Sequence, residues 1–158
     1  MDELNTKEFN HSPRYNIAPS QSIPVIFNDS NDKRVISLMR WGLIPRWAKE
    51  QSIGYKLINA RSETIEQKPF FRDSFLQRRC LIPADGFYEW KKQNGKKQPM
   101  RIILHNKGIF AFSGVWDYWN SAEGTIHSCS IITTTANDYI KDIHDRMPVI
   151  VVNRAVWR

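Results

Sequence analysis

The stretch that says most about the fold is Phe87-Tyr88-Glu89-Trp90-Lys91-Lys92, followed by Asn94-Gly95 and a return arm over residues 99–104. Its first arm alternates with a period of two residues, which is typical of a β-strand. Asn-Gly between two such arms is a strong signal for a type I′ hairpin turn. Glu89 shares a strand face with Phe87, so we expect its carboxylate to lie in an enclosed place rather than in bulk water.

A carboxylate in such a place either pairs with a cation or has a raised pKa and acts as an acid. The purely structural alternative is a cross-strand salt bridge from Glu89 to Lys91 or Lys97. The pattern places those lysines on the outside of the hairpin, which favours the functional interpretation. Glu89 is therefore a candidate catalytic residue.

Working outward from the hairpin, the sequence predicts a mixed α+β domain. About eight short strands, mostly antiparallel, form a sheet that curls into a partial barrel with a few short helices around it. Besides the two hairpin arms, strands are expected over residues 23–27, 35–41, 55–58, 80–83, 109–116, 126–133 and 148–152.

The first two of these strands are predicted to form a hairpin, and residues 117–125 are predicted to be a loop. Helices are expected over residues 70–78 and 137–143, and residues 153–158 look like the start of another. A further short helix, capped by Ser62 or Asn59, is expected after residue 62.

A second candidate site lies in Ile143-His144-Asp145-Arg146-Met147-Pro148, where three ionisable side chains stand between the predicted helix and an apolar strand. Histidine is suited to proton transfer near neutral pH. The alternative is a solvated turn in which Asp145 and Arg146 pair on the surface. His144 becomes a stronger candidate for a functional residue because other parts of the chain offer it partners.

Those partners are Asn59-Ala60-Arg61, Glu89 and an unusual number of tryptophans, six in 158 residues. Helix capping would explain Asn59 but not Arg61, and an arginine beside a strand end is a good phosphate ligand. Trp41 fits a buried indole in a tight turn. Trp47 follows Pro45 in a polar neighbourhood and is the better candidate for an exposed stacking surface.

The chain has a net charge of +7 and a pI of about 9.6. This favours an anionic partner, with nucleic acid as the leading candidate, although a basic protein can also be merely soluble. Its 158 residues indicate one domain, with no apolar run that could span a bilayer and no signal peptide, so we expect a cytosolic protein. We interpret Cys80 and Cys129 as small buried residues, and we expect neither a disulfide nor a metal site.

Five motifs together resemble one family, the SRAP (SOS-response-associated peptidase) family. They appear in the family's order and cover nearly the whole chain from Tyr15 to Val152. The motifs are Tyr15-Asn16-Ile17-Ala18-Pro19, Trp41-Gly42-Leu43-Ile44-Pro45, Asn59-Ala60-Arg61-Ser62-Glu63-Thr64, Arg79-Cys80-Leu81-Ile82-Pro83-Ala84-Asp85-Gly86-Phe87-Tyr88-Glu89-Trp90 and Ile143-His144-Asp145-Arg146-Met147-Pro148.

The resemblance implies a single SRAP-like domain over residues 1–158 that recognises abasic sites in single-stranded DNA. It implies a monomer without cofactor, of bacterial or phage type, cytoplasmic and associated with the nucleoid when bound to DNA. Family members begin with a cysteine whose α-amine forms a Schiff base with the abasic sugar aldehyde. The thiol then closes a thiazolidine ring, which gives a stable DNA–protein crosslink.

By position, Asn59, Glu89 and His144 would line that site. A carboxyl group and an imidazole can supply the acid–base help that Schiff-base formation needs. The DNA-binding residues implied are two arginines for the phosphates and three aromatic residues for the neighbouring bases: Arg61, Arg146, Trp41, Trp47 and Phe70.

The sequence departs from the family's pattern at both ends. Position 2 is Asp2, no cysteine precedes Cys80, and the family's opening Cys-Gly-Arg block and its usual C-terminal region are missing. We therefore expect a domain truncated at both ends, with impaired crosslinking, weak single-strand binding and at most a Schiff base through another amine. A fragment, a misplaced start codon and a naturally shortened relative all remain open as explanations.

Two other functions also stay open. One is a non-catalytic module that binds single-stranded DNA. The other is an autoproteolytic cysteine-type peptidase, as the family's name indicates. A peptidase would need a thiolate beside a histidine, and neither cysteine has the polar, accessible neighbourhood that this requires.

Overall fold

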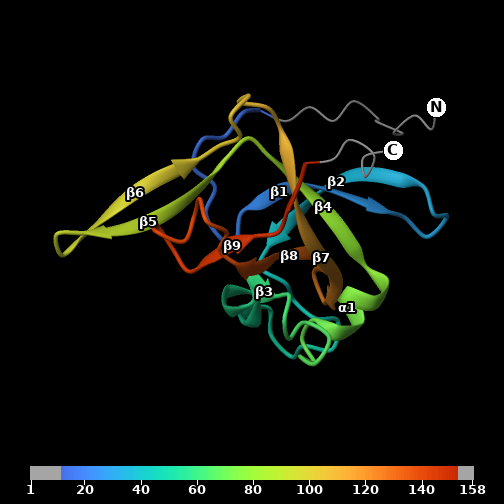
Figure 1. The fold of residues 1–158 in the computed structure, drawn as a ribbon. Helices are drawn as coiled ribbons and strands as arrows, with labels where there is room; N and C mark the ends of the chain where they lie inside the picture. The colour runs from blue at the N-terminus through green and yellow to red at the C-terminus, as the bar shows by residue number, and fades with distance from the viewer. Residues whose placement is uncertain (1–11, 153–158) are drawn as a thin grey trace.

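The structure is a computed structural model of the chain and describes residues 12–152 (Figure 1). The helix start expected over residues 153–158 lies outside this part. Strands dominate the fold, with one short α-helix and one 3₁₀ helix. The elements are β1 (Ser22–Asn28), β2 (Arg34–Trp41), η1 (Gln51–Lys56), β3 (Asn59–Arg61), α1 (Arg72–Gln77), β4 (Arg79–Ala84), β5 (Phe87–Gln93), β6 (Lys96–Ile102), β7 (Phe110–Ser121), β8 (Gly124–Thr135), β9 (Arg146–Pro148) and β10 (Ile150–Val151).

Five strands form a closed barrel. The order is β7-β4-β1-β2-β8, and β8 pairs with β7 again, which completes the ring. The pairs are antiparallel except for β2 with β8, where Arg40 lies opposite Ser128 in a parallel ladder. The predicted curled sheet is therefore confirmed, and the barrel is closed rather than partial.

The barrel interior is filled by apolar side chains from all five strands. Residues that point inward alternate with residues that point outward, as a strand requires. The buried members are Ile23, Val25, Met39, Cys80, Ile82, Phe110, Phe112, Cys129 and Ile131. Both cysteines are free thiols in this core, as predicted.

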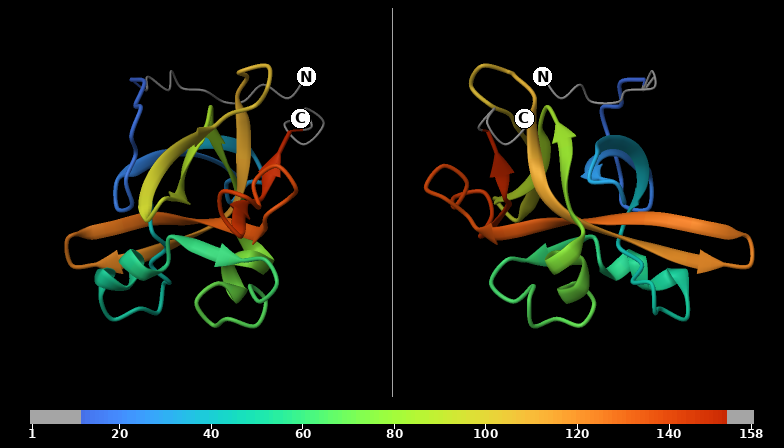
Figure 2. Two further views of the ribbon diagram at one scale, coloured as in Figure 1. Left: turned by 60° about the vertical axis from the view of Figure 1, so that its left-hand side comes forward. Right: turned by 90° about the vertical axis from the view of Figure 1, so that its right-hand side faces the viewer.

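A second apolar cluster lies on the other side of β7 and β8. Val115 and Ile132 point away from the barrel interior and pack with Leu43, Ala60 and Phe71. These two long strands are buried on both faces, which explains their nearly continuous apolar runs. Figure 2 shows their hairpin continuing past the barrel, with η1 and the loops around α1 beneath it.

The β5–β6 hairpin is a separate two-stranded sheet that projects from the barrel (Figure 1). Asn94 and Gly95 have φ angles of 50° and 73°. A type I′ turn needs positive φ at both central residues, so the predicted turn is confirmed. The β1–β2 hairpin is also confirmed, with Ile26 opposite Ile36.

The strand expected over residues 55–58 is wrong. Residues 51–56 form the 3₁₀ helix η1, and β3 begins only at Asn59. The helix lies in close backbone contact with the turn after β2, because a Cβ on Gly42 would lie 2.5 Å from the carbonyl oxygen of Gly54. The short helix expected after Ser62 is also wrong, since residues 62–67 form turns.

The helix expected over residues 137–143 is a set of turns instead. Asn137 caps the first turn, because its side-chain oxygen accepts the N–H groups of Tyr139 and Ile140, each at 3.1 Å, but the turns do not continue as a helix. The N–H of Ala136 donates to the carbonyl of Asp145, which closes the segment into a loop. This closure lets β9 pair with β8 directly after it.

The loop expected over residues 117–125 is a continuation of two strands. β7 runs to Ser121 and β8 begins at Gly124, so only a two-residue turn separates them. The polar residues that suggested a loop include Asp117, which is buried and paired with arginines. Asp117 therefore belongs to an internal ion network rather than to a solvated loop.

Candidate functional site

The three predicted site residues come from three separate elements around the end of β8. Asn59 begins β3, which pairs with one edge of β8, and β9 pairs with the other edge. Thr133 lies between Arg61 and Pro148 in these ladders. The tertiary structure thus places the Asn59 strand and the strand after His144 on either side of β8.

Glu89 belongs to the third element, the protruding β5 strand, and is half-buried there. Its cross-strand neighbour is Met100, while Lys97 lies opposite Lys92. Among residues 12–152 Glu89 forms no ion pair, so the structural alternative of a cross-strand salt bridge does not apply. The expected alternation along β5 is confirmed by its burial pattern.

Burial raises the pKa of the Glu89 carboxyl above its usual value of 4.5. His144 and the N–H of Trp90 act in the opposite direction, and the negative charge of Asp145 adds to the increase. Glu89 and His144 therefore lie within electrostatic reach of each other. In the described chain, no hydrogen bond joins Asn59 to either residue.

The imidazole of His144 is held on one side. The backbone N–H of Arg146 donates to Nδ1 of His144 (3.0 Å), and a carboxylate oxygen of Asp145 lies 3.2 Å from the same nitrogen. The carbonyl of Arg146 is slightly farther away, at 3.3 Å. Nδ1 thus has one donor and two acceptors near it; in the tautomer that carries its proton on Nε2, Nδ1 accepts the Arg146 N–H.

Arg146 does not present its guanidinium to solvent. Its two terminal nitrogens donate to the two carboxylate oxygens of Glu63, at 2.7 and 3.0 Å, and Nη2 also donates to the Thr133 hydroxyl (3.1 Å). The Arg146 hydrogen bonds hold the pKa of Glu63 at about 2. Arg61, by contrast, is exposed and forms no ion pair in the part of the chain that the structure describes.

Two of the predicted aromatic residues lie together. The rings of Trp47 and Phe70 stack with centroids 5.6 Å apart and an interplanar angle of 27°, and both side chains are exposed. Trp41 instead packs against the barrel core and donates its indole N–H to the carbonyl of Ile58 (3.0 Å). The structure thus gives Trp41 a packing role, as its place in a tight turn indicated.

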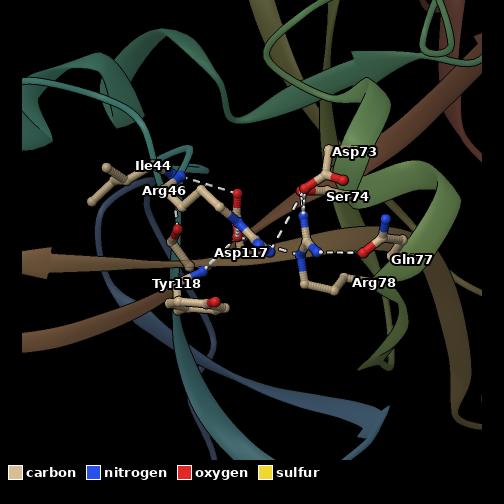
Figure 3. A network of polar contacts seen from close by, with 9 residues as sticks. Ile44, Arg46, Asp73, Ser74, Gln77, Arg78, Asp117 and Tyr118 are labelled. Carbon is tan, nitrogen blue, oxygen red and sulfur yellow. Dashed lines mark hydrogen bonds and ion pairs between the residues drawn. The ribbon is translucent and has the colours of Figure 1, made fainter. Parts of the chain in front are cut away.

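An ion network with a buried centre includes Arg46, the residue before Trp47 (Figure 3). A carboxylate oxygen of Asp117 is 3.2 Å from Nε of Arg46 and 3.3 Å from Nε of Arg78. The Arg78 contact lacks hydrogen-bond geometry and is purely ionic. Asp73 of α1 pairs with both arginines, and the Arg46 guanidinium lies 4.6 Å from the centre of the Tyr118 ring.

Sequence reasoning missed Asp117 and Glu63. The first was placed in a loop, and the second was assigned no function. Their partners lie 71 and 83 positions away in the sequence, so no local pattern could have paired them. In residues 12–152 no group of three or more potential ligands could hold a metal ion, and no helix is long and apolar enough to cross a membrane.

Comparison with known proteins identifies close relatives. A family model described as SOS response associated peptidase (SRAP) matches residues 1–158. The chain is 49% identical over 165 residues to "Abasic site processing protein YoqW" of Bacillus subtilis (strain 168), covering 99% of this chain and 73% of YoqW. It is 34% identical to "Abasic site processing protein HMCES" of Xenopus tropicalis and spans about half of that protein, 51%.

Solved structures share the fold. A crystal structure of a protein from Bacteroides thetaiotaomicron superposes with a TM-score of 0.77 at 32% identity, over 85% of this chain and 60% of that protein. A second, from Bordetella bronchiseptica, has a TM-score of 0.75 at 30% identity, over 86% of this chain and 71% of that protein.

Proposed function

Because this chain belongs to the SRAP family, we propose that it processes abasic sites in single-stranded DNA, at a site formed by Asn59, Glu89 and His144. The observation that carries the proposal is the half-buried Glu89 with a raised pKa beside His144. Two proton-exchanging groups within reach of each other suit a reaction that moves several protons. The named function of the relatives, abasic site processing, supplies the substrate class.

The reaction begins when a primary amine attacks the aldehyde carbon of the ring-opened sugar. The resulting carbinolamine loses its hydroxyl as water once that oxygen is protonated, and the amine gives up its own proton. A carboxyl with a raised pKa and an imidazole can provide and accept these protons. Asn59 is exposed at its strand end and can donate and accept hydrogen bonds, so its proposed role is to orient the amine or the sugar.

Crosslinking by the family's route requires a cysteine that is both N-terminal and accessible. The 158 residues contain two cysteines, and both are buried in the barrel. Burial raises the pKa of the Cys80 thiol well above 9.0 and that of Cys129 to about 12, so neither is a ready thiolate. We propose that the 158-residue chain binds the lesion and forms at most a Schiff base through another amine. It closes a thiazolidine only when a cysteine precedes it.

We propose that a single strand of DNA contacts exposed aromatic and basic side chains of the protein. The exposed Trp47 and Phe70 rings form an aromatic surface on which a base can stack, and the exposed Arg61 is the proposed phosphate ligand. Arg146 and Trp41 remain predicted contacts, although the former is paired with Glu63 and the latter with Ile58. In this proposal the protein acts as a monomer, in the cytoplasm at the nucleoid; its relatives include proteins of Bacillus subtilis and of Bacillus phage SPbeta.

A denaturing gel tests the proposal. The purified chain is mixed with single-stranded DNA carrying one abasic site, beside a version that begins Met-Cys-Gly-Arg. We expect a shifted band with the second version, lost on Glu89→Ala or His144→Ala. Shifted bands with both versions would show that another amine suffices for a stable crosslink. A band with neither would overturn the crosslinking assignment.

A second candidate function is non-catalytic binding of single-stranded DNA. The net charge of +7 and the exposed Trp47–Phe70 pair favour it. Binding that survives both Glu89→Ala and His144→Ala without any covalent product would support it. The peptidase alternative is disfavoured, because both thiols are buried and hold their protons.

A further inference from the structure

Arg146 connects His144 to the rest of the fold. Its backbone N–H donates to Nδ1 of His144 (3.0 Å), and in the sheet it lies opposite Thr135 of β8. The loop before it is made of turns, in which the His144 N–H donates to the carbonyl of Ile140 (3.0 Å) and the Ala136 N–H donates to the carbonyl of Asp145. Because the Arg146 amide contacts the ring itself, the orientation of the imidazole depends in part on how firmly residue 146 is held.

Besides the backbone pairing of β9 with β8, Glu63 holds the side chain of Arg146 from a distant part of the chain. The Glu63 carboxylate accepts hydrogen bonds from the Arg146 guanidinium at 2.7 and 3.0 Å, and the Thr135 hydroxyl donates to the same carboxylate at 3.4 Å. The guanidinium also reaches Thr133, which leaves its side chain only 19% exposed. A two-bond arginine–carboxylate pair fixes direction as well as distance.

We propose that Glu63 is a positioning residue for His144. By holding Arg146 against β8, it keeps the Arg146 amide on Nδ1 of the imidazole and leaves Nε2 as the nitrogen that meets the substrate. The catalytic meaning of this role rests on the proposed function, whereas the structural link can be measured without DNA. Glu63 itself does not touch the reacting atoms.

The structural link is tested by hydrogen exchange followed by NMR. In Glu63→Ala we expect the Arg146 amide to exchange roughly tenfold faster, with a changed environment of the His144 ring nitrogens. The amide of Ile131, which donates to the carbonyl of Ile58 in the core, reports on global stability and should not change. Glu66→Ala is the matched control, because it removes an exposed carboxylate from the same turn.

The reactive consequence is tested in the version that begins Met-Cys-Gly-Arg. Glu63→Ala should slow crosslinking roughly tenfold, and Glu63→Gln, which keeps one acceptor of the same length, should recover most of that loss. Unchanged Arg146 exchange in Glu63→Ala, or the same change in Glu66→Ala, would overturn the positioning role. If no version reacts with DNA, the proposed function fails, and the exchange experiment still decides whether Glu63 holds His144.

Discussion

Two glutamates near the site respond to folding in opposite directions. Hydrogen bonds from Arg146 hold the pKa of Glu63 at about 2, while burial raises the pKa of Glu89 above 4.5. The first is lowered because a cation favours its charged form, and the second is raised because desolvation disfavours charge. Their contributions to stability therefore have opposite pH dependence.

For Glu63 the folded pKa lies below the unfolded value. Its stabilising contribution is present above about pH 4.5 and is lost as the pH falls towards 2. Glu63→Gln should therefore lower the melting temperature at pH 6, and the difference from the parent chain should vanish near pH 2. Thermal melts across this range measure it, with Glu66→Gln as the control. A difference in melting temperature that persists at pH 2 would contradict the assignment of the lowered pKa to Glu63.

For Glu89 the folded pKa lies above the unfolded value. Its contribution is present below about pH 4.5 and is lost as the pH rises through the raised pKa. Glu89→Gln should thus leave the protein at least as stable as the parent at pH 7, while slowing the proposed reaction by ~10²–10⁴-fold. Melting curves measure the stability of the variant, and crosslinking rates measure its reactivity. A clear loss of stability at pH 7 would show that the carboxylate has a structural role.

At the scale of elements, the ion network joins segments that no strand pairing connects. Asp117 of β7 accepts the backbone N–H of Arg46, and through Arg78 and Asp73 the same network reaches α1 (Figure 3). Its Asp117 and Arg78 side chains are 4% and 8% exposed. The turn that carries Trp47 is thereby fixed against the helix that follows Phe70.

Removing one partner of a buried pair leaves the other charge without compensation. Asp117→Asn should therefore destabilise the protein by roughly 3–5 kcal/mol. Asp138→Asn, at an exposed pair with Lys141, should cost less than about 1 kcal/mol. Urea denaturation of both variants measures the difference. Equal, small effects would show that water reaches the Asp117 carboxylate.

At the scale of the whole molecule, the charge of +7 governs how the protein meets DNA. Each phosphate neutralised on a single strand contributes about 0.7 to the slope of log affinity against log salt. We expect Arg61→Ala to reduce the slope by about this amount. Lys141→Ala, whose amine is paired with Asp138, should change it little. Binding titrations at several salt concentrations measure both slopes, and equal changes would remove Arg61 as a specific phosphate ligand.

The sequence alone determined the parts of the fold that depend on neighbours in the chain. The Asn94-Gly95 turn and the alternation around Glu89 appear as predicted, and so do the β1–β2 hairpin and most of the buried strands. These features follow from backbone preferences and side-chain period, which act over a few residues. The same motifs identified the family, and the family model matches the whole chain.

Only the tertiary structure decided what depends on distant contacts. The parallel pairing of β2 with β8 belongs to the closed barrel, and β3 pairs with β8 outside it. The strand expected over residues 55–58 is replaced by η1, whose Gly54 lies close to Gly42. Glu63 and Asp117 find their partners 83 and 71 residues away. Such pairings are determined by the packing of the whole chain, so a local pattern could indicate Glu89 and His144 as candidates but not the distant partners of Glu63 and Asp117.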